Sequence, residues 1–470
     1  MSARANLSND RHGERAQVAA TASVRLAELL GRLSLAFDIA NDAPYGKGVR
    51  LVVLAVELGR LAGATDEELH DTFWVSLLSY LGCTGVAQDD ALSDTSLKLA
   101  HIVGAGPRVV SALTQLCGCW DERGRPGQLA SDALALPMRL LRMAHVADIA
   151  HQQHGQAGAM AHVRRRVGGG ELDPRLARVL VEGQRELFAA IEDARIFDRF
   201  LALEPGSVAC ADDRHIDDVA RALATFADLR CPIFVGHSTR VAVLAERAAG
   251  QVGLSADDTR SLRRAALLHD IGRLGVPNAI WMRPGRLDWG EMERVRLHAY
   301  YTERVLSPIG VLGPVADIAA AAHERLDGSG YPGSRMARSL LPAARILAAA
   351  DMAVAMSEAR PYRPALSPAA VARELMSEAS AGGVDASAAD AVLASLGMKM
   401  HIVPRPTHRV SDRELEVCRL IAHGKMNKEI ADVLGISLRT VQNHIAHIFD
   451  KLGLHSRSGV AVWLVENEAV

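Results

Sequence analysis

Residues 265–277, AALLHDIGRLGVP, decide how the middle of this chain folds. The apolar run before His269-Asp270 predicts the end of a buried helix, and the glycines and proline after it predict a tight turn. A His-Asp pair alone says little, because the chain has a second one at His70-Asp71 in different surroundings. The pair at His269-Asp270 indicates a functional site only together with the residues around it.

Other His and Asp residues of the same region stand at the ends of apolar helices or inside them. His237 opens the helix HSTRVAVLAERAA, and Asp351 interrupts the apolar stretch ILAAADMAVAM. Burying an unpaired carboxylate is costly, and a cation removes that cost. Imidazole and carboxylate ligands suit Fe, Mn or Zn. We therefore predict a metal site formed by His237, His269, Asp270, His298, His323 and Asp351.

The segment from about Phe226 to Asp385 resembles the HD-GYP branch of the HD phosphohydrolase superfamily. The resemblance is carried by GHSTRVA, LLHDIGRLGVP, LHAYYTERVL, HERLDGSGYP, LPAARILAAAD and RPYR. Members of this family are all-helical and hydrolyse phosphodiesters, typically cyclic di-GMP, at a centre of two or three metals. The resemblance implies a divalent metal cofactor here, Fe or Mn, with one or two ions per chain.

The resemblance also implies a role for each candidate ligand. One metal would be bound by His237, His269, Asp270 and Asp351. Asp270 would bridge to a second metal, whose other ligands would be His298 and His323. A hydroxide between the two cations would be the nucleophile, its pKa lowered by the metals.

The candidate catalytic residues are Asp270 and Arg273. Arg273 stands where the family has a Lys that faces a substrate phosphate, and it keeps the positive charge. By the same resemblance, the substrate loop would be lined by Tyr331, Pro332 and Arg363, because Arg suits phosphate.

The sequence departs from the family pattern at positions that bear on catalysis. Ala322 replaces the first of two adjacent histidines, so the second metal loses a ligand. Ile233 replaces a Glu that is used where a third metal is present, and Val354 replaces an acid often found after the metal-binding Asp. Three interpretations stay open: a nucleotide or metal sensor, an active phosphodiesterase, or a scaffold for dimerisation. We prefer the sensor because of Ala322.

Part of the N-terminal half resembles the middle of the chain in sequence but lacks the candidate metal ligands. A shift of 190 residues lays Gly46–Val86 over Gly236–Val276 without a gap, and glycines and apolar positions coincide. The candidate metal ligands are not repeated. Lys47, Ser79 and Tyr80 stand at the positions that match His237, His269 and Asp270. With a gap, His145 falls at the place of Asp351. We predict a degenerate HD-like helical domain over residues 16–200, unable to bind metals in this way.

Residues 409–465 carry a helix-turn-helix pattern. Two short helices, a tight turn at Gly435 and a third helix capped by Ser437 are predicted from the apolar spacing. Gln and Asn suit paired hydrogen bonds to adenine, and Arg and Lys suit phosphates. The candidate DNA-binding residues are Lys428, Arg439, Thr440, Gln442, Asn443, His447 and Lys451.

This segment resembles the LuxR family of DNA-binding domains over its full length. The resemblance rests on Arg413-Glu414, Asn427-Lys428-Glu429-Ile430-Ala431, Ile436-Ser437, Thr440-Val441, His444, Lys451-Leu452-Gly453 and Arg457. It implies DNA as a partner and binding as a homodimer. Gln442 stands where members often have Lys, and this difference could alter the base preference. The alternative is a small helical bundle for protein contacts.

The whole sequence predicts an all-α protein: two tandem HD-type domains, the first degenerate, then a four-helix LuxR-type domain. The expected segments are a disordered tail at 1–15, domains at 16–200 and 205–398, a linker at 399–408 and the DNA-binding domain at 409–470. Six scattered cysteines and no long apolar run predict free thiols, a cytoplasmic location and no membrane contact. We expect a transcriptional regulator whose middle domain binds metal and senses a nucleotide, or alternatively a cyclic-dinucleotide phosphodiesterase that also binds DNA.

Overall fold

The computed structural model describes residues 23–41, 43–82, 96–101, 103–115, 134–213, 215–398, 412–452, 454 and 456–468. The predicted tail at 1–15 and linker at 399–408 lie outside these residues. Helices dominate the described part, and its one two-stranded sheet pairs β1 (Val24–Arg25) antiparallel with β2 (Cys210–Ala211). The predicted all-α class is therefore confirmed. None of the described helices has both the length and the apolar character needed to cross a membrane.

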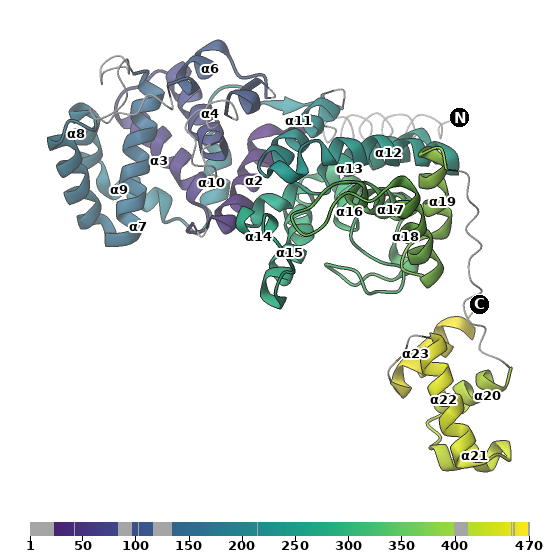
Figure 1. Ribbon diagram of the computed structural model, residues 1–470. Helices are drawn as coiled ribbons and strands as arrows, with labels where there is room; N and C mark the ends of the chain where they lie inside the picture. Colours follow the sequence, from purple (N-terminus) through teal and green to yellow (C-terminus); the bar gives the residue numbers. More distant parts are fainter. Residues whose placement is uncertain are drawn as a thin grey trace, which may run out of the picture.

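The N-terminal half is built from helices that Figure 1 draws in purple and blue. A 33-residue helix in this half, α7, is broken at Gly155, whose backbone is not helical. The bounds are α2 (Leu26–Ala40), α3 (Lys47–Leu61), α4 (Asp66–Gly82), α6 (Pro107–Leu113), α7 (Leu136–Gly168), α8 (Pro174–Glu182), α9 (Gln184–Ile191) and α10 (Ile196–Ala202).

The middle of the chain forms a second set of helices with short 3₁₀ turns between them. The α-helices are α11 (Ile216–Leu229), α12 (His237–Val252), α13 (Ala256–Leu268), α14 (Asn278–Trp281), α15 (Trp289–Leu306), α16 (Gly313–Ala320), α17 (Pro342–Ser357), α18 (Pro368–Ala381) and α19 (Ala386–Ser395). The 3₁₀ turns are η2 (Pro232–Phe234), η3 (Ile271–Gly275), η4 (Gly310–Leu312) and η5 (Ala337–Ser339).

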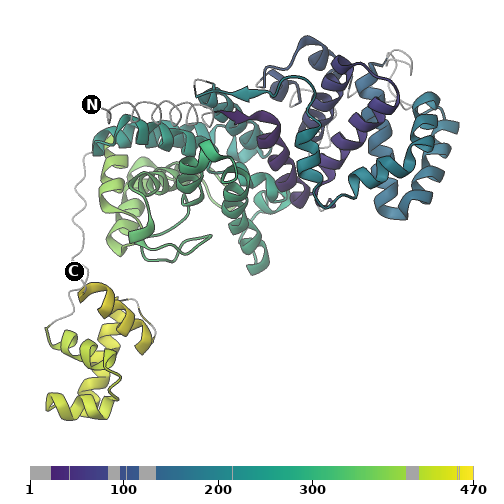
Figure 2. The ribbon, with the colours of Figure 1, turned by 180° about the vertical axis from the view of Figure 1, so that it is seen from behind.

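The C-terminal helices, drawn in yellow-green to yellow in Figures 1 and 2, have a small hydrophobic core of their own. They are α20 (Asp412–Ala422), α21 (Asn427–Leu434), α22 (Leu438–Leu452) and α23 (Arg457–Glu468). Gly435 adopts a left-handed conformation between α21 and α22, and the Thr440 amide donates to the Ser437 hydroxyl at 3.1 Å. The predicted turn and cap are therefore present.

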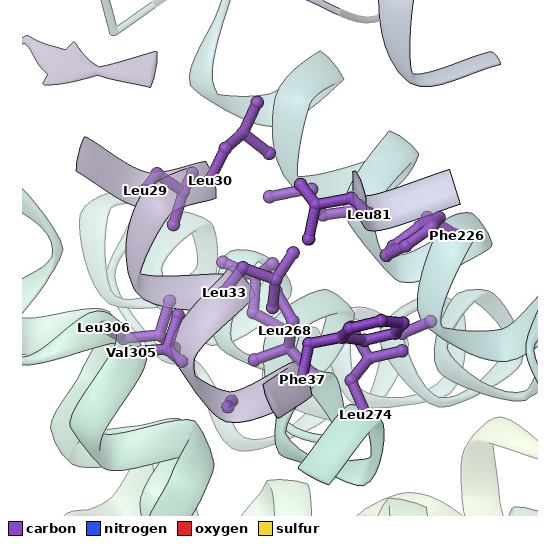
Figure 3. Close-up of a cluster of buried hydrophobic side chains, with 14 of the residues drawn as sticks. Leu29, Leu30, Leu33, Phe37, Leu81, Phe226, Leu268, Leu274, Val305 and Leu306 are labelled. Atoms are coloured by element: carbon purple, nitrogen blue, oxygen red, sulfur yellow. The ribbon is translucent and has the colours of Figure 1, made fainter. Parts of the chain in front are cut away.

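The two larger halves share one hydrophobic core. A continuous cluster of buried residues runs from Val24 to Leu393, so the predicted boundary near residues 200–205 does not separate two independent cores. Helix α2 is the main link, because it packs on α3 of its own half and on η3 and α15 of the middle half. Figure 3 shows Leu33 and Phe37 of α2 beside Leu268 and Leu274, which flank the His269-Asp270 pair. The N-terminal half therefore supports the chain segment that follows this pair.

The local geometry supports the repeat between the halves. Helices α3 and α12 begin directly after Gly46 and Gly236, which are 190 residues apart and both left-handed, with φ of 82° and 76°. Four residues later, Arg50 donates to the Tyr45 carbonyl at 2.7 Å, and Arg240 donates to the Val235 carbonyl at 3.0 Å. The same sequence register therefore gives the same helix start and the same backbone contact.

The N-terminal copy fills the place of the metal ligands with an internal polar cluster. Tyr80, at the register of Asp270, donates its hydroxyl to the Asp38 carboxylate, and Gly46 donates its amide to the same group at 2.8 Å. Burial raises the pKa of Asp38 to about 6. Arg50 forms a buried ion pair with Asp148 at 2.9 Å. His145 is exposed beside this cluster. Among the described residues, the groups able to hold a metal all lie in the middle half.

Candidate metal centre

Five segments of the middle half bring the six predicted ligands together. His237 is the first residue of α12, and His269-Asp270 joins α13 to η3. His298 lies in α15, His323 follows α16, and Asp351 lies inside α17. All are buried except His323, which is half-buried. The sequence motifs are far apart along the chain, so only the packing of these helices creates the site.

The first group surrounds one oxygen of Asp270. The Nε2 atoms of His237 and His269 lie 3.4 and 2.8 Å from Asp270 Oδ2. The same two nitrogens lie 3.1 and 3.6 Å from Asp351 Oδ1. Ligand atoms of these four residues all lie within 4.8 Å of one another. This is the arrangement of two imidazoles and two carboxylates that suits a divalent cation.

The second group surrounds the other oxygen of Asp270. The Nε2 atoms of His298 and His323 lie 3.3 and 3.6 Å from Asp270 Oδ1, and 2.7 Å from each other. Asp270 therefore presents one oxygen to each group, as a bridging carboxylate would. This second group has three protein ligands, whereas the first has four.

The outer ring nitrogens fix which side of each histidine faces the cluster. Nδ1 of His237 lies 2.9 Å from Glu358 Oε2, and Nδ1 of His269 lies 2.8 Å from the Ala266 carbonyl. Nδ1 of His298 contacts the Val295 carbonyl. Because these oxygens can only accept, Nδ1 carries the hydrogen and Nε2 is left with its lone pair toward the site. These histidines are therefore oriented as metal ligands.

Unpaired atoms at the centre also fit a bound cation. His269 Nε2 and both Asp270 oxygens are buried and have no partner with hydrogen-bond geometry among the described residues. Buried polar atoms without partners are rare in folded proteins and cost free energy. A divalent ion in the first group would satisfy His269 Nε2 and Asp270 Oδ2, and one in the second group would satisfy Asp270 Oδ1. The cluster fits a divalent metal site on the donor types and on these orphaned atoms together.

The electrostatics of the site favour positive charge. Burial opposes a charge on His237, but the carboxylates of Asp270, Asp351 and Glu358 outweigh it and raise the pKa to about 9. Burial likewise opposes charge on His269, and the two aspartates raise its pKa to about 10. Burial and the neighbouring His298 lower the pKa of His323 to about 4, so this ring is a neutral donor. A metal would replace the protons that the carboxylates otherwise hold on the first two rings.

A cavity of about 620 Å³ opens beside the two groups. His298, His323 and Asp351 form part of its wall, and Phe234, Trp281 and Tyr331 add aromatic surface. Arg273 and Arg360 line it as well. The guanidinium of Arg273 lies 3.9 Å from the ring of Phe234 and contacts the Asp270 carboxylate. The cavity therefore combines apolar faces with cations next to the metal ligands, as an anionic ligand with planar rings requires.

Of the three residues predicted to line the substrate loop, only Tyr331 lines the cavity. Tyr331 lines the cavity and stacks on His323 with the ring centroids 5.1 Å apart. Pro332 and Arg363 are not among the described residues that line it. Arg363 donates to carbonyls at the end of α17, those of Ala355 at 2.6 Å and Met356 at 3.1 Å. Arg363 therefore holds the end of this helix, and Arg360 takes the place at the cavity that was expected for it.

Gly272 is required by close packing at the centre. A Cβ atom at this position would lie 2.0 Å from the His298 carbonyl oxygen, which is far inside van der Waals contact. The Gly272 amide donates to the Thr302 hydroxyl at 3.1 Å, and this hydroxyl donates to the His269 carbonyl at 2.9 Å. The turn after Asp270 is thereby fixed against α15, which carries His298.

Glu358, Arg360 and Trp281 belong to the site but were not found from the sequence. Glu358 bonds His237 and also Arg360, whose guanidinium lies 2.7 Å from Oε2. Trp281 packs edge-on against Phe234 and His298, with centroids 5.1 and 5.8 Å apart. Arg360 is the first residue of the RPYR motif, but no role is predicted for it from the sequence, and no spacing or motif singles out Glu358 or Trp281. Their neighbours in space come from other helices.

The departures from the family pattern are visible in the structure. Ala322 is fully buried next to His323, and its methyl group offers no ligand to the second group. Ile233 accepts a hydrogen bond from Arg360 with its backbone carbonyl at 2.6 Å, and its side chain has no metal-binding atom. Val354 is buried in α17. The second group is thus the weaker of the two.

The predicted DNA-binding residues lie on the C-terminal helices. Arg439, Gln442, Asn443 and His447 are exposed on α22, and Lys428 is exposed on α21. Thr440 is half-buried at the start of α22, and the side chain of Lys451 lies outside the described part.

Several residues that carry the LuxR resemblance hold these helices together instead of facing outward. Arg457 contacts the side chain of Asn427 and the Lys425 carbonyl. Arg413 donates to the Leu434 carbonyl at 2.6 Å.

The fold and the His/Asp cluster define an HD-type domain with a site that fits a divalent metal. In agreement, the model of the HD domain matches residues 221–387, and that of bacterial regulatory proteins of the luxR family matches residues 408–464. The chain thus contains an HD domain followed by a luxR-family helix-turn-helix domain, and its homologues are HD-GYP phosphodiesterases.

Three curated relatives illustrate this likeness. The chain is 29% identical over 407 residues to 3'3'-cGAMP-specific phosphodiesterase 3 of Vibrio cholerae, covering 73% of this chain and 88% of that protein. It is 32% identical over 178 residues to 3'3'-cGAMP-specific phosphodiesterase 1 of the same organism, covering 38% of this chain and 41% of the relative. It is 40% identical over 131 residues to a cyclic di-GMP phosphodiesterase of Thermotoga maritima, covering 27% and 35%.

A solved structure extends the likeness to most of the chain. The crystal structure of a cyclic GMP-AMP-specific phosphodiesterase of Vibrio cholerae matches with a TM-score of 0.59 and 29% identity. The match covers 80% of this chain and 98% of that one. The similarity therefore extends beyond the HD domain into the N-terminal half.

Replacing Asp270 by Ala should empty both groups together, because each group uses one oxygen of this carboxylate. Metal per chain, measured by elemental analysis of protein purified without oxygen or chelators, should fall to near zero. Asp317→Ala is the matched control, since Asp317 is exposed on α16, and it should keep the full content. Retention of full metal in Asp270→Ala would contradict the bridging role.

Replacing Glu358 by Ala should weaken metal binding by about 10–100-fold, because His237 loses the partner that orients its ring. Glu358→Gln keeps an acceptor oxygen and should lose less. Titration of Mn²⁺ against a competing fluorescent chelator measures both, with exposed Glu374→Ala as the control. Equal affinities for wild type and Glu358→Ala would show that His237 is held by its packing alone.

Proposed function

We propose that this protein is a DNA-binding transcriptional regulator whose HD domain binds metal and senses a cyclic dinucleotide. The observation that carries the proposal is the combination, in one chain, of the bridged His/Asp cluster with its cavity and a luxR-family domain. A helix-turn-helix with polar side chains exposed on α22 has the chemistry to read base edges.

The ligand class rests on the cavity and on the relatives. Arg273 and Arg360 can bind phosphates, and the faces of Phe234, Trp281 and Tyr331 can stack on bases. Relatives over this region are named for 3'3'-cGAMP and cyclic di-GMP. We therefore propose a cyclic dinucleotide as the ligand of this chain, bound next to Fe or Mn, with one or two ions.

Regulation requires that the ligand distinguish two states of the protein. A ligand changes DNA affinity only if it binds the DNA-competent arrangement with a different affinity from the incompetent one. We propose that a homodimer binds DNA, because paired helix-turn-helix domains read two half-sites. A cytoplasmic location accords with this function.

Active hydrolysis is a second candidate function, favoured by the bridging position of Asp270. When bound, two metals would lower the pKa of a shared water and supply the nucleophile. In that reaction His237, His269, Asp351, His298 and His323 would hold the metals, and Arg273 would orient a phosphate. Ala322 speaks against this reading, because it leaves the second group with three protein ligands.

Asn443→Ala should weaken specific DNA binding by about 1–3 kcal/mol, because a paired hydrogen bond to adenine is lost. DNA fragments selected from a random-sequence library supply the ligand, and fluorescence anisotropy measures the affinity. Metal content should not change. His423→Ala, exposed outside α22, is the control. Loss of metal in Asn443→Ala would contradict the assignment of DNA binding to the luxR-family domain and metal binding to the HD domain.

An experiment on the Mn-loaded protein distinguishes the two proposed functions, regulator and phosphodiesterase. Cyclic di-GMP or 3'3'-cGAMP should bind, remain intact, and change the affinity for the selected DNA about 5–150-fold. Chromatography of the nucleotide and anisotropy of the DNA check both points, with Asp270→Ala as the control. Hydrolysis with unchanged DNA affinity would favour the enzyme instead, and no nucleotide binding would overturn the proposed ligand.

A further inference from the structure

A second cleft, of about 210 Å³, lies where the N-terminal half meets the HD domain. One wall comes from α2 and the loop after it, and the other comes from the end of α15. The lining residues are Arg32, Leu35, Ala36, Ile39, Tyr45, Tyr300, Tyr301, Arg304 and Val305. None of them lines the cavity at the metal centre. The cleft is therefore a separate site.

The lining combines two guanidinium groups with three phenol rings and includes no acidic residue. Arg304 is exposed and has no ion pair or hydrogen bond with any described residue. Arg32 pairs with Glu28 at 2.8 Å on its own helix and lies over the ring of Phe197. The cleft thus carries one uncompensated cation at Arg304, with Arg32 held in place beside it.

The tyrosines provide planar surface around these cations. Tyr45 and Tyr300 are 68% and 43% exposed, so their rings are open to a ligand. The ring centroids of Tyr300 and Tyr301 are 6.0 Å apart and the ring planes are tilted by 58°, so the two rings face different directions. Aromatic faces stack on planar rings, and guanidinium groups bind phosphate with two parallel hydrogen bonds.

We propose that this cleft binds a small ligand with one aromatic ring and one phosphate, an aryl or nucleoside monophosphate. Its volume is about a third of that of the cavity at the metal centre. The smaller volume favours a single ring with a phosphate over a cyclic dinucleotide. Arg304 and Arg32 bind the phosphate, and Tyr45 and Tyr300 stack on the ring.

The position of the cleft connects such a ligand to the metal centre. Helix α15 carries His298, and its Tyr301 ring packs so closely on η3 that a Cβ atom at Gly275 would lie 2.4 Å from it. Thr302, the next residue, holds the His269 carbonyl. A ligand bound between α2 and α15 therefore contacts both the N-terminal half and the helix that positions a metal ligand.

The test uses phenyl phosphate as the probe and isothermal titration calorimetry of the full chain. One molecule should bind per chain, and inorganic phosphate or phenol alone should bind at least about tenfold more weakly, because each lacks one half of the contacts. GMP should compete with phenyl phosphate. Failure of phenyl phosphate to bind would overturn the proposal.

Variants locate the binding. Arg304→Glu should weaken binding at least about tenfold, since it reverses the unpaired charge. Arg294→Glu changes an exposed arginine of the same helix outside the cleft and should bind like the wild type. Tyr300→Ala tests the stacking surface independently and should also weaken binding. Unchanged binding in Arg304→Glu, or an equal loss in Arg294→Glu, would show that the probe binds elsewhere.

Discussion

The buried carboxylate of Asp270 is the constraint on which this structure depends. It is almost fully enclosed, its two oxygens face two different pairs of histidines, and neither oxygen has a hydrogen-bond partner in the described part of the chain. A buried negative charge is tolerated only with positive charge beside it. The four histidines and the Arg273 guanidinium lie around this carboxylate, and Asp351 adds a second negative charge that a bound cation would balance. The ligands come from α12, the end of α13, α15 and α17, and Gly272 allows α15 to approach the turn after Asp270 closely.

The N-terminal half has the same local helix geometry as the HD domain but no carboxylate at the position of Asp270. The left-handed glycines, the arginine that caps the preceding carbonyl and the helix starts persist at a spacing of 190 residues. At the register of Asp270 stands Tyr80, hydrogen-bonded to Asp38, and the buried pair of Arg50 and Asp148 balances its own charge. This half has thus replaced an external cation by internal partners. It remains joined to the HD domain through α2, whose apolar face packs on the turn after Asp270.

The HD domain differs in how it is joined to its two neighbours in the chain. On one side, α2 packs on the turn after Asp270 within one shared core, and close-packed interiors transmit strain. On the other side, the luxR-family helices have a separate core, and Arg439, Gln442 and Asn443 of α22 are exposed. Relatives named as cyclic GMP-AMP-specific phosphodiesterases share the HD domain and much of the N-terminal half. In this chain a luxR-family helix-turn-helix domain follows that framework, and Ala322 offers no ligand atom to the second group.

The sequence by itself determined the helical class, the six metal-ligand candidates, the repeat and the DNA-binding module. Each of these leaves a local signature: a helical period, a turn glycine, or a motif such as LLHDIGRLGVP. Only the tertiary structure decided that Asp270 presents one oxygen to each group, that Glu358 orients His237, and that Arg360 reaches the cavity while Arg363 caps α17. It also showed that the two predicted HD-type segments share one core. The physical reason is that these features depend on contacts between helices far apart in the chain, where packing decides which neighbouring side chain, Arg360 or Arg363, points inward.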